Sequence, residues 1–450
     1  MTATIWLFAT GQLGWAILAG LVSNWLVYFY QPSTEAINAG QLLYVPQGRV
    51  VLGVLTIIGV ITAGGRIFDA FTDPWIANKS DRSTNPKGRR IPFMRMVAIP
   101  FAVITTLIFM APVKSISGIN TAWLLFGLLG FYLCMTIYCT PYNALIPLIG
   151  KDQKSRIAVS TAISLTFILG TAFAYLAPII WGALTPSLGR ITAMRATFGA
   201  LSIIACICML IPTFAIDERK LGAVEPAKEN AFESLKITFG NKDFRTFVYS
   251  DVLYFTALTI FQTGLPFFVT SLMGLNEGST SLLFMLMTVL SLLWYPLVNK
   301  LAPKCGKKRL VRFAFIIFAI TYVLTSLSGI FVQGQLSWGI LIVATASIPM
   351  AILGILPQAM VADIAEEDTV TSGTNRDGMF FAARTFAFKM GQSLAMLIFT
   401  GFAASGQIGY RMAAITAAVL CIFANLALIR FDEKRILAVC MDHEASLLKN

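Results

Sequence analysis

The feature that most restricts how this chain can fold is a series of long apolar segments that recurs along all 450 residues. Each segment has the length that an α-helix needs to cross a bilayer, roughly 20 residues. Charged residues make up only 12% of the sequence and hydrophobic residues 57%, whereas a soluble domain averages about 25% charged residues. A water-soluble globule is therefore excluded, and we predict an all-α polytopic membrane protein.

The apolar pattern predicts twelve membrane spans. They lie at roughly 6–30, 50–78, 92–112, 119–149, 158–183, 194–216, 246–273, 279–299, 313–334, 337–361, 379–404 and 410–430. The first segment has no basic start and is too long for a signal peptide, so we interpret it as a span.

A polar connection at 217–245 is the longest that we expect on the basic side of the membrane, and it falls between spans six and seven. It divides the chain into an N-terminal six-helix half (1–216) and a C-terminal six-helix half (246–430). Residues 431–450 form a tail, and the connection at 31–49 is predicted to be a loop without a fold of its own.

Basic residues are concentrated in alternate connections. The clusters comprise Lys79, Arg82, Lys87, Arg89 and Arg90, then Lys151, Lys154 and Arg156, then the basic residues of 219–245 and of 300–312. The intervening connections hold only Arg49, Lys114, Arg190, Arg195 and Arg411. Because Lys and Arg are retained in cytoplasmic loops, we predict that both termini are cytoplasmic and that the protein lies in the cytoplasmic (inner) membrane.

Several classes of function are excluded by composition. None of the seven cysteines forms a CxxC pair, and the single histidine, His443, lies in the polar tail. A zinc site and a histidine-dependent catalytic triad or proton relay are therefore not expected, and we predict neither an enzyme nor a resident cofactor. The net charge of +12 is spread over the connections, and without a soluble basic domain no nucleic-acid partner is expected.

Span two carries ionisable residues, each of which costs at least ~2.5 kcal/mol inside a bilayer. Asp69 and Asp73 are four residues apart and Arg66 precedes Asp69 by three, so all three share one helix face. Two carboxylates one turn apart repel each other unless a proton, a cation or an arginine lies between them. With the Thr72 hydroxyl, these hard oxygen atoms suit Na⁺, Li⁺ or H⁺ better than a transition metal. The alternative is an Arg66–Asp69 ion pair, with Asp73 as a helix-end charge.

Span eleven contains two basic residues, Arg384 and Lys389, which are five apart and need not point the same way. Lys389 lies about ten residues inside the span and is a natural partner for the two aspartates. Arg384 could meet a substrate anion. For both side chains, the alternative is extension to the membrane interface.

Span four combines aromatic and polar side chains. It contains Thr136, Tyr138, Thr140, Pro141, Tyr142 and Asn143. The two tyrosines form an i,i+4 pair. A proline inside a span frees backbone carbonyls, and helix packing explains Pro141 as well as a functional role does.

Four stretches of this sequence resemble a known family. They are Gly11–Gly14 with Tyr28–Tyr30, Gly65–Pro74 with Ser80–Arg82, Pro141–Pro147, and Ala362–Asp363 continuing to Lys389–Gly391. The sequence resembles the glycoside–pentoside–hexuronide:cation symporters, which are melibiose permease-like members of the major facilitator superfamily. The resemblance implies a fold of twelve transmembrane helices in two six-helix halves.

The resemblance also implies a cation site. Asp69 and Asp73 would be the carboxylates that bind the coupling cation, with Thr72 and Thr136 at neighbouring ligand positions. Lys389 matches the family lysine beside that site, and it would act in coupling together with Arg66. Thr72 stands where the melibiose-type pattern has asparagine, which leaves Na⁺ and H⁺ both open as the coupling ion.

The sugar-binding residues of the family do not carry over. Ala16, Cys139 and Ser164 stand where melibiose-type members have two aspartates and an arginine, which argues against a melibiose-like substrate. We expect a more aromatic substrate site instead. Its residues would be Trp15, Tyr138, Cys139, Tyr142, Phe381, Arg384 and Thr385, with Phe388 as a further ring.

We therefore predict a monomeric secondary active transporter, which moves a small organic solute together with Na⁺ or H⁺ by alternating access. The solute would be a glycoside, a uronide or another organic anion. The basic loops, including Asp81–Arg82 and 87–90, would also latch the cytoplasmic side closed. Two alternatives remain, a symporter of lysolipids or similar amphiphiles and a non-transporting receptor that kept the fold.

Overall fold

The computed structural model describes residues 2–81, 83, 85, 88–150, 153–220, 231–330, 336–373 and 377–447. The N-terminal part contains α1 (Thr2–Tyr30), α2 (Thr34–Asn38), α3 (Ile57–Asp81), α4 (Ile91–Ile108), α5 (Gly118–Ile149), α6 (Gln153–Tyr175), α7 (Ala177–Leu188), α8 (Arg190–Ala215), η1 (Glu218–Lys220) and α9 (Ala231–Gly240). The C-terminal part contains α10 (Lys242–Phe267), η2 (Phe268–Leu272), α11 (Glu277–Cys305), α12 (Lys307–Ser326), α13 (Leu336–Ser372), α14 (Asp377–Ala403), α15 (Gly406–Leu428) and α16 (Glu433–Leu447).

Local sequence fixes several helix ends. The Ser117 hydroxyl accepts a hydrogen bond from Ile119 N at the start of α5, and the Asn241 side chain accepts from Asp243 N and Phe244 N at the start of α10. Such side chains satisfy backbone N–H groups that have no partner within the first helical turn. Between α11 and α12, Gly306 has a φ of 86°, a left-handed conformation that glycine adopts without steric cost.

Eleven helical segments of the described residues are long and apolar enough to cross a membrane. The predicted span two, α3, is not among them because five charged residues interrupt it. Nevertheless, α3 packs along α5 on one side and along α14 on the other, in the interior of the bundle. The least apolar of the predicted spans therefore contains the expected cation site.

Four of the predicted spans differ from the structure in ways that have an identifiable physical cause or a large extent. Span two begins at Ile57 instead of 50, because Leu52 and Gly53 have positive φ angles that interrupt a helix. Span five is split at Leu176, just before Pro178, which lacks a backbone N–H.

The other two differences are in the C-terminal half. The helix of span nine ends at Ser326, and residues 331–334 of the predicted span lie outside the described residues. Span ten continues to Ser372 instead of 361, and contacts of its polar end with neighbouring elements stabilise the extension. Asp363 pairs with Lys307 at 2.6 Å and Glu367 pairs with Arg435 at 3.1 Å.

The predicted loops contain some helix. The connection at 217–245 includes η1 and α9, the tail includes α16, and the connection at 31–49 includes α2. Residues 221–230 of the connection, as well as Arg82 and Lys87 of the predicted latch, lie outside the described residues.

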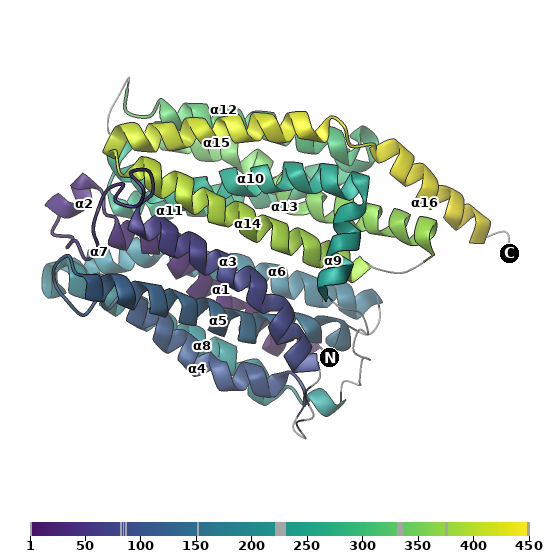
Figure 1. Cartoon of the computed structure of the whole chain (residues 1–450), viewed down its shortest axis with the longest axis horizontal. Helices are drawn as coiled ribbons and strands as arrows, with labels where there is room; N and C mark the ends of the chain where they lie inside the picture. The colour runs from purple at the N-terminus through teal and green to yellow at the C-terminus, as the bar shows by residue number, and fades with distance from the viewer. Residues whose placement is uncertain are drawn as a thin grey trace.

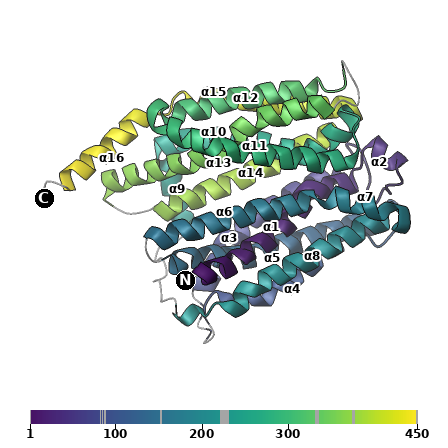
Figure 2. The same ribbon diagram turned by 180° about the vertical axis from the view of Figure 1, so that it is seen from behind.

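The helices form two groups that lie side by side. Figure 1 shows α1 to α8 in the lower group and α10 to α15 in the upper group, and Figures 1 and 2 show both chain termini at one end of the bundle, which we call the terminal end. Contacts between α3 and α14, between α1 and α10, and between α11 and both α6 and α7 join the two groups. Any site between α3 and α14 therefore lies at the boundary of the two halves.

At the end opposite the termini, polar contacts close the two halves against each other. Glu277, in the first turn of α11, accepts hydrogen bonds from Tyr28 Oη (2.5 Å) and Trp181 Nε1 (2.7 Å) and forms an ion pair with Arg190. Beside it, Ser271 Oγ donates to Glu35 Oε2 at 2.6 Å. A single C-terminal-half carboxylate is thus bound by three N-terminal-half side chains.

Candidate cation and substrate site

Close packing of α3 against α5 brings the aspartates within reach of Thr136. Gly65 lies one turn before Asp69, and a Cβ atom at this position would lie only 2.6 Å from the ring of Tyr132 on α5. Glycine is therefore required for this approach of the two helices, since any side chain would push them apart. The small residue in α3 allows a short threonine on α5 to contact both carboxylates.

The two carboxylates share one ammonium group and one hydroxyl group. Lys389 Nζ on α14 lies 2.9 Å from Asp69 Oδ2 and 2.5 Å from Asp73 Oδ2. Thr136 Oγ1 lies 2.9 Å from Asp69 Oδ1 and 3.2 Å from Asp73 Oδ1, and because a hydroxyl carries one proton, it donates to one of them at a time. Thr72 Oγ1 is 3.2 Å from Thr136 Oγ1. The structure thus brings Asp69, Asp73, Thr72, Thr136 and Lys389 together.

This cluster has a formal charge of −1, from two carboxylates and one ammonium group. The Asp69 side chain is fully buried, whereas that of Asp73 is 30% exposed. Asp69 Oδ2 lies 2.9 Å from Lys389 Nζ but has no hydrogen-bond partner in the described part of the chain. Asp69 Oδ2 is thus a buried oxygen without a hydrogen-bond donor, and it belongs to a cluster with a net negative charge. Such a site can bind one additional proton or monovalent cation.

Arg66 does not neutralise the aspartates in the way that the alternative interpretation required. Its Nη2 atom donates to Ser23 Oγ at 3.0 Å, and its guanidinium lies 5.1 Å from the centre of the Tyr132 ring. Within the described residues, the ion pair of Asp69 is formed with Lys389, which belongs to the other half. Arg66 therefore lies beside the cluster without closing it.

Arg384 has a partner that the sequence analysis missed. Its Nε and Nη2 atoms donate to Asp251 Oδ2 and Oδ1 at 2.7 and 3.2 Å, and both side chains are buried. Asp251 is a charged residue about five positions inside predicted span seven, and its cost in a membrane was a signal that could have revealed it. Because its charge is compensated, Arg384 is not the free cation that we expected at the substrate site.

The tyrosine pair of α5 has a packing role. Tyr138 Oη donates to Met209 O at 2.8 Å and Tyr142 Oη donates to Phe8 O at 3.0 Å. Both rings are fully buried, and the Tyr142 ring stacks on that of Phe8 at 4.2 Å. The hydroxyl groups and ring faces of Tyr138 and Tyr142 are therefore engaged by α1, α8 and each other, and their contact with substrate stays a prediction.

The remaining predicted substrate residues are half-buried and come from both halves. Trp15 and Cys139 lie on α1 and α5, and Phe381 and Thr385 lie on α14. Trp15 Nε1 is buried and has no hydrogen-bond partner among the described residues, so it is an available donor. In contrast, Thr385 Oγ1 donates to Phe381 O at 2.9 Å.

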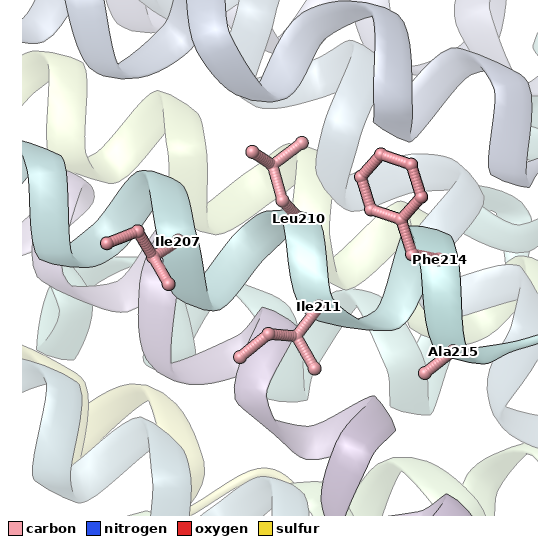
Figure 3. Close-up of a pocket in the computed structure, with 5 residues that line it drawn as sticks. All are labelled: Ile207, Leu210, Ile211, Phe214 and Ala215. Carbon is pink, nitrogen blue, oxygen red and sulfur yellow. The ribbon is translucent and has the colours of Figure 1, made fainter.

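A surface hollow on α8 differs in character from this region. Figure 3 shows its lining of Ile207, Leu210, Ile211, Phe214 and Ala215. All five residues come from one helix, and their side chains offer no hydrogen-bonding group. It therefore cannot select a polar solute, and the boundary between the halves is the better candidate site.

Comparison with known proteins identifies the family. Residues 7–429 match the family described as MFS/sugar transport protein. The chain belongs to this family. Its fold resembles that of the solved nucleoside transporter NupG, with a TM-score of 0.65 at 12% identity over 96% of this chain and 99% of that one. It also resembles a bacterial homolog of the human lysosomal transporter Spinster, with a TM-score of 0.66 at 14% identity over 97% and 96% of the two chains.

Several curated relatives are symporters. The putative glycoside/cation symporter YagG of Escherichia coli is 24% identical, with 78% of this chain and 76% of the relative covered. The inner membrane symporter YicJ of the same organism is 23% identical, with 74% and 71% covered. The sodium-dependent lysophosphatidylcholine symporter 1 of Xenopus tropicalis is also 23% identical, with 76% and 70% covered.

These findings confirm the resemblance to glycoside–cation symporters of the major facilitator superfamily and the all-α fold. The protein is a multi-pass membrane protein and a secondary active transporter of a small molecule. The family is one of transporters, so the prediction that the chain is not an enzyme is confirmed as well.

Proposed function

We propose that this transporter couples the movement of a small organic solute to that of one monovalent cation, Na⁺ or H⁺, which binds at Asp69 and Asp73. The observation that carries the proposal is the buried cluster with a net charge of −1. Its hard oxygen atoms are the type that Na⁺ or a proton prefers, and a bound monovalent cation would make the cluster neutral.

Cation binding can be coupled to movement of the two halves because the residues of the site come from both of them. The two carboxylates and Thr136 belong to the N-terminal half, whereas Lys389 belongs to the C-terminal half. Lys389 Nζ lies 2.5–2.9 Å from both carboxylates and occupies the position that a bound cation would take. Cation entry therefore displaces Lys389 and removes an ion pair between the halves, so that occupancy of the site changes how α3 and α14 interact.

For the solute, the geometry favours a neutral molecule over an anion. Because Arg384 is bound at two points by buried Asp251, an anion would have to displace this carboxylate. A glycoside agrees with the name of YagG. An amphiphile is the second candidate, supported by the relationship to a sodium-dependent lysophosphatidylcholine symporter and by the half-buried Trp15 and Phe381.

We further propose that the protein is a monomer in the inner membrane, with the terminal end in the cytoplasm. The distribution of Lys and Arg and the name of YicJ support this location. Asp73 lies one turn nearer the terminal end than Asp69 and is the more exposed of the two. In the closed arrangement at Glu277, the cation therefore exchanges with the cytoplasm.

Uptake into proteoliposomes tests this function. Neutral glycosides, uronates and lysolipids would be offered under an imposed Na⁺ or H⁺ gradient, and accumulation of one class should require one of these gradients. Asp69→Asn and Asp73→Asn should abolish accumulation. Asp217→Asn, which affects an exposed ion pair with Arg219, is the matched control and should transport normally. Accumulation by both site variants at the wild-type level would refute the proposal.

A further inference from the structure

The Asp251–Arg384 pair is a second buried ion pair within the spans, distinct from the cation cluster. The carboxylate and the guanidinium meet at two points, at 2.7 and 3.2 Å, with side chains 4% and 8% exposed. One turn further on, Phe255 lies 5.6 Å from the guanidinium, and its ring stacks on that of Phe388 at 4.9 Å. The fixed fork of arginine makes such a two-point contact strongly directional.

The pair belongs to a continuous seam between α14 and α10. Arg384, Phe388 and Gly391 are spaced i, i+4 and i+7, so they share one face of α14. At Gly391 a Cβ atom would lie 2.9 Å from Val252 O, and Thr256 Oγ1 donates to Gly391 O at 3.1 Å. This face is therefore held tightly against α10 within the C-terminal half.

A different face of α14 meets the other half. Phe386 contacts Phe71 at 5.9 Å, Lys389 binds the two aspartates, and Ser393 Oγ donates to Ala63 O at 3.1 Å. Because both faces belong to one rigid helix, the contact with α10 determines the direction in which Lys389 points.

The charges of Asp251 and Arg384 also affect the cation cluster. Arg384 precedes Lys389 by five residues, about 7.5 Å along the helix axis. Without its partner, the buried guanidinium would be an additional cation close to Asp69 and Asp73, and it would oppose the entry of a coupling cation. Without Arg384, the buried Asp251 carboxylate would be an additional negative charge near the cluster, and it would favour the entry of a coupling cation.

From these contacts we propose that Asp251 is a positioning residue for the coupling site. It orients α14 and neutralises Arg384, so that the Arg384 guanidinium does not compete with Lys389 and the coupling cation for Asp69 and Asp73. This inference rests on the proposed cation coupling. Asp251 acts through Arg384 and α14, and it contacts neither Asp69 nor Asp73.

The test is a thermal-unfolding titration of the purified full-length protein with Na⁺ and Li⁺ against choline, repeated over a pH series. It requires no knowledge of the solute. Asp251→Asn should raise the cation concentration at the midpoint on the order of tenfold, the size expected for one unit charge at roughly 10 Å in a protein interior. Arg384→Gln should lower it, and the double variant should return to within about threefold of wild type.

The two single variants should therefore shift the cation concentration at the midpoint in opposite directions. If the pair had a purely structural role, both single variants would bind the cation more weakly. Asp251→Glu keeps the negative charge, so the cation concentration at its titration midpoint should equal that of wild type even if its unfolding temperature falls. Asp363→Asn, which breaks the Lys307 pair elsewhere in the same half, should change only the unfolding temperature. The inference would be overturned if both single variants shifted the midpoint concentration equally in one direction. It would also be overturned if the midpoint of the double variant were no closer to the wild-type value than the midpoints of the single variants. A wild-type protein that responds to neither ion nor pH would instead reject the proposed coupling and this inference with it.

Discussion

At the scale of single residues, the central feature is a lysine that competes with the transported ion. Lys389 binds two carboxylates that are otherwise supported mainly by one hydroxyl, that of Thr136. An ammonium group cannot leave this position without a replacement charge, because two neighbouring buried carboxylates repel each other. Competition between Lys389 and the cation predicts different effects for substitutions of Lys389 and of Thr136.

Thr136→Val should weaken cation binding at least tenfold. The variant removes the Thr136 hydroxyl oxygen, which lies within 3.2 Å of both carboxylates and would be a ligand of the bound cation. An interaction of a hydroxyl with a charged group contributes ~1.5–3 kcal/mol, where 1.4 kcal/mol corresponds to a factor of ten. Calorimetric titration would measure the affinity. Thr105→Val is a matched control, since that buried hydroxyl donates only to Phe101 O of its own helix, and it should leave the affinity unchanged.

Lys389→Met should bind the cation more tightly while losing coupled transport. The variant removes the internal competitor and changes the charge of the cluster from −1 to −2. Titration calorimetry and gradient-driven uptake measure the two properties separately, and Lys389→Arg, which keeps the charge, should not gain affinity. Loss of cation binding in Lys389→Met would show that the lysine supports the ion and does not compete with it.

Residue spacing predicted much of the cation cluster and less of its surroundings. Asp69 and Asp73 share a face because helical periodicity requires it, and the cost of Lys389 inside a span indicated a partner of opposite charge. Spacing within a helix does not reveal which neighbour each face meets. For that reason the Asp251–Arg384 pair and the backbone contacts of Tyr138 and Tyr142 became visible only in three dimensions.

At the scale of helices, α3 and α5 show how a polar span is accommodated. α3 is too polar to qualify as a span by composition, yet it lies between α5 and α14 with its charges directed at partners. Eleven of the spans and their order followed from hydropathy alone, and α3 was the exception. The ends of α3 and α13 did not follow from hydropathy, because positive φ angles and ion pairs with distant residues determine them.

Tyr138→Phe tests the packing role of α5. The variant removes the hydrogen bond to Met209 O, so the protein should lose about 0.5–1.5 kcal/mol of stability with unchanged solute affinity. Thermal unfolding and a solute-binding assay on the same preparation would measure both. A large loss of solute affinity at unchanged stability would show that Tyr138 contacts the substrate.

At the scale of the whole molecule, the two halves are closed at the end opposite the termini through Glu277. Three side chains of the N-terminal half bind this carboxylate, so its charge stabilises the closed arrangement. Alternating access requires these contacts to break when the transporter opens on that side.

Glu277→Gln should therefore shift the population towards an arrangement that is open at this end. Spin labels at Leu188→Cys and Leu282→Cys, two exposed positions on α7 and α11, would report the distance between the halves in a background without native cysteines. We expect a larger fraction of long distances in Glu277→Gln. Asp363→Asn should leave the distribution unchanged because its ion pair lies within one half, and identical distributions for Glu277→Gln and wild type would contradict the closing role.

The most direct test of the account is equilibrium cation binding to the purified transporter, measured by calorimetry across a pH series for wild type, Asp69→Asn and Asp73→Asn. The net charge of −1 in the cluster predicts that wild type binds one Na⁺ per chain, or takes up one proton per chain as the pH falls. Both variants should lose this binding. Wild-type cation binding in both variants would contradict the assignment of Asp69 and Asp73 as the coupling site.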